Sequence, residues 1–147
     1  MEKFEQLFAE YPCILTDELV KKNTADILAS HKEENNTREV WMQCLHQIDL
    51  TTLNGDDTTE KVATMAQKVN DFDGHFPCVP NVAAMCVYPA LVETAKEVLT
   101  EPIGIAAVAA GFPASQTFIE VKVAEAAMAV AAGATEIDIV ISIGKFL

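Results

Sequence analysis

Four apolar runs, separated by three amphipathic helical patterns, restrict the folds that this chain can adopt. The apolar runs occupy residues 47–54, 82–88, 103–110 and 133–142. Between the first two, Val62, Ala66 and Val69 recur at helical spacing, and the later intervals repeat this pattern. Strands that alternate with helices predict βαβ units and a parallel sheet. A doubly wound sheet and a (β/α)8 barrel both have this order of elements.

Two details of the sequence favour the barrel. No glycine-rich phosphate-binding fingerprint follows the first apolar run, and polar residues lie at or near the ends of at least two runs. With 147 residues, half of them hydrophobic, the chain is long enough to bury a sizeable core. We therefore favour an α/β fold of the TIM-barrel type over residues 45–147, preceded by a helical extension over residues 1–44, and the pattern alone leaves the doubly wound sheet open as the alternative.

The helical extension is expected to contain two or three short helices within residues 1–36. Phe4, Leu7 and Tyr11 follow helical spacing, and Thr16 precedes two acidic residues, which is typical of a helix start. The segment carries no recognisable chemistry. We expect it to cover one apolar end or face of the domain that follows.

The acidic composition argues against several classes of partner. The chain has 10 Lys and Arg residues against 22 Asp and Glu residues, a formal net charge of −12. Such a charge argues against binding of nucleic acid and against docking on anionic membranes. The N-terminus is too charged for a signal peptide, and the longest apolar run is shorter than a membrane span.

The cysteines indicate neither a metal site nor an oxidising compartment. Cys13, Cys44, Cys78 and Cys86 form no CxxC pair and have no zinc-type spacing to the histidines. We interpret them as reduced, mostly buried thiols. Reduced thiols are typical of a cytoplasmic protein, which is the location that we expect.

The last apolar run, residues 133–142, contains a carboxylate among β-branched residues. Its composition predicts a parallel strand buried on both faces, and Asp138 interrupts the apolar sequence. A buried carboxylate costs several kcal/mol unless it is paired or hydrogen-bonded. Asp138 is therefore either a structural residue that bonds a neighbouring backbone group or Lys, or a proton-transfer group that points into a barrel interior.

The third helical pattern has recognisable ends. Ser115 or Thr117 is expected to cap its N-terminus, and Thr117 together with Glu120 matches a capping box. Gly133 is expected to end the helix, because glycine is the usual residue at that position.

Four segments in order resemble one enzyme family. They are DLTTLN at 49–54, AAMCVYP at 83–89, AAVAAGFP at 106–113 with the helix that follows, and TEIDIVISIG at 135–144. With these segments the chain resembles deoxyribose-phosphate aldolase, a class I aldolase on a (β/α)8 barrel. The resemblance covers the chain from about residue 45 to its C-terminus.

The resemblance implies an activity and a catalytic residue. The family cleaves 2-deoxyribose 5-phosphate to glyceraldehyde 3-phosphate and acetaldehyde through a lysine Schiff base, without a metal or other cofactor. The aspartate of its fourth-strand motif takes part in the proton relay, and that position is Asp138 here. Burial raises the pKa of a carboxyl group toward the working range, which suits such a role.

The resemblance also implies a substrate-binding set. Asp49 matches an aspartate that lines the family's active site and helps to hold its charged lysines, although a turn or cap role is equally open. Thr51 and Leu53 match positions in the pocket wall. Cys86 matches a cysteine near the substrate aldehyde, where it is either a reactive thiol or a packed small hydrophobe.

The sequence lacks the family's Schiff-base lysine. In the family that lysine lies on the sixth strand, a second lysine lies on the seventh, and the phosphate site follows the seventh and eighth strands. Lys145 follows the fourth strand, and we interpret it as a solvated loop lysine. We therefore expect the first half of an aldolase barrel, inactive by itself, from a homo-oligomeric enzyme that acts on a small phosphosugar.

A noncatalytic function is the alternative. In this second interpretation the chain is a half-barrel module that pairs with itself or with a separate chain carrying the remaining strands. A half barrel leaves its first and fourth strands as open edges and one sheet face uncovered, so we expect the isolated chain to associate.

Overall fold

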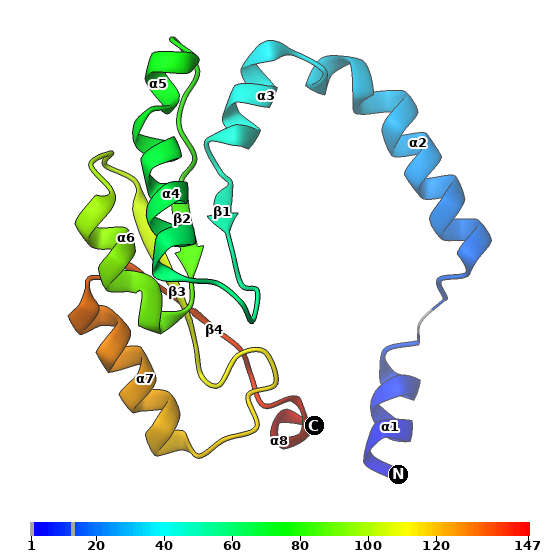
Figure 1. Cartoon of the computed structure of the whole chain (residues 1–147). Coiled ribbons are helices and arrows are strands. Elements are labelled where there is room, and N and C mark those ends of the chain that lie inside the picture. The colour runs from blue at the N-terminus through cyan, green and yellow to red at the C-terminus, as the bar shows by residue number, and fades with distance from the viewer. Residues whose placement is uncertain (1, 13) are drawn as a thin grey trace. The chain divides into compact units, whose positions relative to one another are not determined.

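The computed structural model describes residues 2–12 and 14–147 (Figure 1). Within it the chain divides into two compact units, one up to Val40 and one from Trp41 onward. Cys13 lies outside the described residues. Among the residues that the structure describes, no helix is both long enough and apolar enough to cross a membrane.

The N-terminal unit is helical. It contains α1 (Glu2–Glu10) and α2 (Asp17–Asn35), and α2 is longer than the short helices that the sequence suggested. Thr16 caps α2 as predicted, because its side-chain oxygen accepts a hydrogen bond from the Leu19 amide at 3.2 Å. That this unit covers an end of the next domain stays a prediction.

The second unit begins within α3 and consists of strand–helix repeats. Its elements are α3 (Arg38–Leu45), β1 (Asp49–Thr51), α4 (Thr59–Asn70), α5 (Phe72–His75), β2 (Ala84–Val87), the 3₁₀ helix η1 (Pro89–Leu91), α6 (Val92–Val98), β3 (Gly104–Ala109), α7 (Ile119–Ala132), β4 (Glu136–Ile139) and α8 (Ile143–Phe146). The described strands form one sheet in the order β1-β2-β3-β4, and each neighbouring pair is parallel. The predicted alternation is therefore confirmed.

One face of the sheet carries the main core. Helices α4, α6 and α7 lie along this face (Figure 1), and their apolar stripes pack on alternate residues of the central strands. Met85 and Val87 of β2 and Ile105 of β3 are buried there, together with Val62 and Val92 of the helices. All four residues of β2 are buried, as its uninterrupted apolar sequence predicted.

The capping box predicted for α7 is wrong. The N-cap residue is Phe118, and no side chain caps the helix there. The Ser115 hydroxyl instead reaches the backbone beyond β4, so tertiary contacts take the group that local spacing assigned to the helix. The predicted end of the helix is confirmed, because Gly133 has a φ of +112° and its amide donates to the Val130 carbonyl.

The burial predicted for the last strand is also wrong. In β4 the residues Glu136, Asp138 and Ile139 are exposed, and Ile137 is half-buried. The reason is position: β4 pairs with β3 on one side and is an edge of the described sheet on the other. The apolar sequence of β4 suits a strand with a neighbour on each side, but among the described strands only β3 pairs with it. The open edges expected of a half barrel are β1 and β4.

Candidate active site on the inner face of the sheet

The face of the sheet opposite the helices gathers the polar residues of the strands. Thr51 of β1 is paired with Cys86 of β2, and Cys86 is paired in turn with Ala106 of β3 and Ala106 with Glu136 of β4. Because side chains alternate along a strand, Asp49 and Asp138 lie on the same face as these residues. We call this the inner face.

A small apolar cluster forms the wall of the inner face. Cys86, Ala106 and Val108 are buried in it. Leu53, Tyr88 and Phe112 pack against them from just beyond the carboxyl ends of β1, β2 and β3. The Tyr88 hydroxyl donates to the Leu53 carbonyl at 3.1 Å, and the Tyr88 ring meets Phe112 edge-on with centroids 6.4 Å apart. This end of a parallel barrel is the end that holds active sites.

Tyr88 and Phe112 were missed by the sequence reasoning. Tyr88 follows β2 directly and Phe112 lies three residues after the end of β3, and such a place in a parallel sheet is itself a signal for a site residue. Their rings give the carboxyl end of the inner face a firm apolar rim.

On the inner face, Cys86 of β2 lies between Thr51 of β1 and the carboxylates of β4. Burial raises its pKa, and the nearby Asp138 carboxylate raises it further, with smaller effects from Asp49 and Glu136 in the same direction. A hydrogen bond with Thr51 opposes these effects. The environment favours the neutral thiol, which suits a packed small side chain better than a reactive nucleophile.

Glu136 is a second carboxylate on β4 that the sequence reasoning did not select. Its carboxylate lies over Gly104 of β3, in space that a Cβ at position 104 would occupy. The two-residue spacing of Glu136 and Asp138 along a strand was the available signal, because it puts both on one face. The free edge of the sheet therefore presents two exposed carboxylates.

A buried carboxylate fixes the loop that follows β1. Asp57 accepts hydrogen bonds from the Thr52 hydroxyl at 2.9 and 3.0 Å and from the Asn54 amide at 3.0 Å, and it forms an ion pair with Lys61. These contacts, the one with Lys61 first, lower the pKa of Asp57 to about 2. The network holds the segment that carries Leu53 at the rim.

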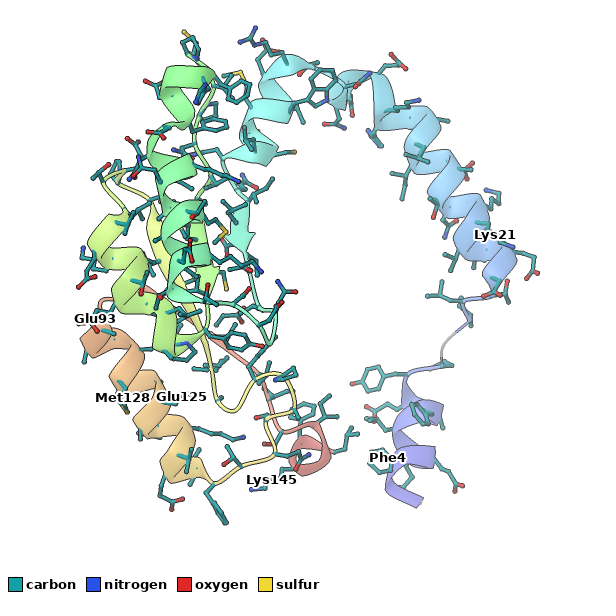
Figure 2. The ribbon with its side chains drawn as sticks, in the orientation of Figure 1. Phe4, Lys21, Glu93, Glu125, Met128 and Lys145 are labelled. Carbon is teal, nitrogen blue, oxygen red and sulfur yellow. The ribbon has the colours of Figure 1, made fainter. Side chains whose placement is uncertain are left out.

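The remaining predicted residues are also located. Thr51 donates its hydroxyl hydrogen bond to the Asp49 carbonyl at 2.9 Å, and the side chains of both residues are exposed on the inner face. Lys145 is exposed as expected, but it lies in the short helix α8 and not in a loop (Figure 2). The structure thus brings Asp49, Thr51, Cys86 and Asp138 to one face, with Leu53 at its carboxyl end.

The chemistry available on this face is acid–base chemistry. None of the described strands contains Lys or Arg, so their inner face offers carboxylates without an amine. Among the described residues, no group of three or more His, Cys, Asp or Glu side chains could hold a metal ion. Carboxylates on this face can exchange protons with a bound group.

Comparison with known proteins matches this region to aldolases. The model of the DeoC/LacD family aldolases matches residues 44–145. A deoxyribose-phosphate aldolase from Homo sapiens is 35% identical over 136 residues, which cover 84% of this chain and 42% of the human protein. The enzyme of the same name from Mus musculus is 34% identical over 140 residues, with the same two coverages. The chain therefore spans less than half the length of these relatives.

Solved structures agree on the fold. A tetrameric deoxyribose phosphate aldolase from Aeropyrum pernix superposes with a TM-score of 0.61 at 22% identity, covering 78% of this chain and 45% of that one. The protein described as QR15, an aldolase, gives a TM-score of 0.60 at 26% identity, covering 69% and 42%. The four parallel strands and their helices are thus part of a TIM barrel.

Proposed function

The chain belongs to the DeoC/LacD aldolase family, and from that premise we propose that residues 45–147 form the first half of the barrel of a deoxyribose-phosphate aldolase. The reaction is the reversible cleavage of 2-deoxyribose 5-phosphate to glyceraldehyde 3-phosphate and acetaldehyde. The observation that supports this most is the shared inner face: Asp49, Thr51, Cys86 and Asp138 come from three strands of the segment that matches the family and lie on one face of the sheet.

We assign the proton transfers to Asp138. Formation of a Schiff base passes through a carbinolamine, which loses water only when its hydroxyl is protonated, and the carbon–carbon cleavage requires a proton to leave a substrate hydroxyl. Asp138 is exposed on the inner face, where its charge raises the pKa of the Cys86 thiol across β3, so a substrate on this face can reach it. Positioned general acid–base groups contribute about a hundredfold or more to such steps.

The other residues of the set shape the pocket. Asp49 supplies a second charge at the first strand, where it would hold the ammonium groups of catalytic lysines. Thr51 and Leu53 form a wall, and Cys86 presents a small neutral side chain beside the reacting carbonyl. The rim residues Tyr88 and Phe112 would exclude water from the cleaved bond.

The nucleophile is proposed to lie outside this sequence. The family's Schiff-base lysine belongs to the sixth strand, and residues 1–147 contain no VKTSTG-like segment. We therefore propose that the 147-residue chain by itself does not form the Schiff base. The active enzyme is proposed to be a cytoplasmic homo-oligomer, a state suggested by the tetrameric relative.

Borohydride trapping tests the missing nucleophile. The chain is incubated with 2-deoxyribose 5-phosphate, reduced with sodium borohydride and weighed as an intact protein. An unmodified mass supports the proposal. A stoichiometric adduct on the wild-type chain that disappears in Lys145→Met would contradict it, since that lysine would then have taken the role assigned to the sixth strand.

A chimera tests the assignment of Asp138. The chain is joined to the second half of the human relative, and cleavage is measured for the parent, Asp138→Asn and the control Glu93→Gln. Glu93 is an exposed carboxylate of α6, on the helical side of the sheet (Figure 2). We expect Asp138→Asn to lose about a hundredfold or more in kcat and Glu93→Gln to be unaffected. Equal activity of all three proteins would exclude Asp138 from the reaction.

The second candidate function is a noncatalytic half-barrel module, and it is favoured by one feature. A groove of about 460 Å³ lies between α7 and the free strand β4, with walls that include Ile119, Val123, Ile139, Ile141 and Phe146. In a complete barrel a further strand and helix cover this position. Co-purification of the chain with a separate polypeptide carrying the remaining strands, in a fixed ratio, would support this candidate over the first.

A further inference from the structure

A lysine and two serine hydroxyls meet where the loop after β3 passes the end of β4. Lys122, from the first turns of α7, donates hydrogen bonds to Ser115 Oγ at 2.5 Å and to Ser142 Oγ at 2.6 Å. Ser115 is 1% exposed, and Lys122 is half-buried. The cluster has no part in the aldolase reaction proposed above, and Lys122 and Ser142 also line the groove between α7 and β4.

The protons of this cluster can be assigned. Ser115 Oγ donates to the Val140 carbonyl at 3.0 Å, and Ser142 Oγ donates to the Ser115 carbonyl at 2.9 Å. A hydroxyl has a single proton, so both oxygens are left as acceptors, and both face the Lys122 ammonium. Lys122 is thus a charged donor held between two acceptors, and we call Lys122, Ser115 and Ser142 the clamp. This arrangement does not describe a serine nucleophile, because both hydroxyl protons are donated to backbone carbonyls and the lysine is the donor to both oxygens.

The clamp lies just beyond the last paired residue of β4. The β3–β4 pairing ends at Ala109 and Ile139, and β4 has no partner on its other side among the described residues. Val140 and Ser142 follow immediately, so the contacts of Lys122 and Ser115 extend the attachment of this strand past its ladder. Asp138 is the residue before Ile139, and its position depends on whether this end of the strand stays attached.

Helix α7 also binds the start of the loop between β3 and α7. Glu125, one turn after Lys122, accepts a hydrogen bond from the Gly111 amide at 2.9 Å (Figure 2). Ser115 has a φ of +55°, a conformation that costs energy for any residue except glycine. A serine at this position is explained by its hydroxyl, which glycine could not supply.

We propose that Lys122 is a positioning residue that fastens the carboxyl end of β4 and thereby orients Asp138. The proposal rests on the function proposed above for its link to catalysis. The clamp itself is a property of this chain, and it is measurable without any aldolase activity.

Hydrogen exchange followed by mass spectrometry tests the clamp in the 147-residue chain. The readout is the exchange rate of peptides that cover residues 136–142, compared among wild type, Lys122→Met, Lys122→Arg and Lys68→Met. We expect about tenfold faster exchange in Lys122→Met, because hydrogen bonds to a charged group are lost. Lys122→Arg keeps the charge and donors and should restore protection, and Lys68→Met, at an exposed lysine of α4, should match wild type.

The variant Ser115→Gly distinguishes the contribution of the Ser115 hydroxyl from that of the backbone conformation at this position. Glycine relieves the positive φ, so a purely local role predicts unchanged or slower exchange, whereas loss of the clamp predicts faster exchange at residues 136–142. Unchanged exchange in both Lys122→Met and Ser115→Gly would overturn the proposal.

The aldolase chimera tests the link to Asp138. There we expect Lys122→Met to lower kcat about tenfold with KM within about twofold of the parent, and Lys122→Arg to recover kcat. Wild-type kcat in Lys122→Met would overturn the positioning role. If Asp138→Asn were also fully active, the proposed function would have failed, and the exchange result would still decide whether the clamp exists.

Discussion

Self-association through the free β4 edge is the consequence of this structure that is easiest to measure. Ile139, Ile141 and Ile143 are 63%, 58% and 63% exposed, and Phe146 is 78% exposed. Ile139, Ile141 and Phe146 line the groove beside α7, and Ile143 begins the short helix α8. An apolar edge with unpaired backbone groups is a template for another strand. We expect the isolated chain to associate, and Ile139→Asp to weaken that association.

The magnitude follows from the exposed fraction. Full burial of an isoleucine side chain is worth about 1.5–3 kcal/mol. At 63% exposure, Ile139 has about 1–2 kcal/mol still to gain from a partner surface. Its loss corresponds to about a 5- to 30-fold weaker dissociation constant, since about 1.4 kcal/mol is a factor of ten. Added salt should strengthen the association of the wild type, because it screens a net charge of −12 per chain.

Size-exclusion chromatography with light scattering and sedimentation velocity over a range of concentrations measure this effect. Met128→Asp is the matched control: Met128 is 71% exposed on α7 and does not line the groove next to β4 (Figure 2). A compact wild-type monomer at every concentration would refute the reasoning. So would an equal effect of Ile139→Asp and Met128→Asp, which would point to general surface hydrophobicity and not to the strand edge.

Three further predictions concern stability and reactivity. Met85→Ala removes a fully buried side chain from the core and should cost about 2–5 kcal/mol in the free energy of unfolding by urea, whereas Met128→Ala should change it by less than about 0.5 kcal/mol; equal costs would contradict the assigned core. The pKa of Asp57 is lowered to about 2 in the folded chain, so its contribution to stability is complete above the pKa of the unfolded chain and is lost as the pH falls toward 2. Asp57→Asn should therefore lower the urea midpoint at neutral pH, with a difference that shrinks in acid, and a difference that is independent of pH would argue against the network. Iodoacetamide should modify the exposed Cys44 at least about tenfold faster than the buried Cys86, as read from peptide masses, because burial both shields the Cys86 thiol and raises its pKa; similar rates would show that the inner face opens readily.

The order of strands and helices was predictable because each element follows from the residues of its own short segment. The apolar sequence of β2, the spacing of Val62, Ala66 and Val69 in α4, and the glycine at 133 each report a local preference. The grouping of Asp49, Thr51, Cys86 and Asp138 came from family resemblance, and the register of the strands gives it a geometric basis.

Other features depend on contacts that local sequence does not record. The exposure of β4 depends on which strand lies beside it, and the Ser115 hydroxyl is drawn from a helix cap to the carbonyl of Val140, 25 residues away. Glu136 and the rim residue Tyr88 had a signal in the sequence, but the register of the strands and their packing are what place them beside the other site residues. Helix α5 is a single short turn in a segment rich in glycine and proline, where spacing carries little information.

The order of the strands also has a consequence for synthesis of the protein. From β2 onward, each described strand pairs with the strand that precedes it in the chain, so the sheet can grow by one unit at a time as the polypeptide leaves the ribosome. Among the described strands, only β1 has to wait for a later strand, β2, to find a partner. At every stage the newest strand forms one exposed edge of the growing sheet and β1 forms the other, so the exposed edge on the growing side moves toward the C-terminus as translation proceeds.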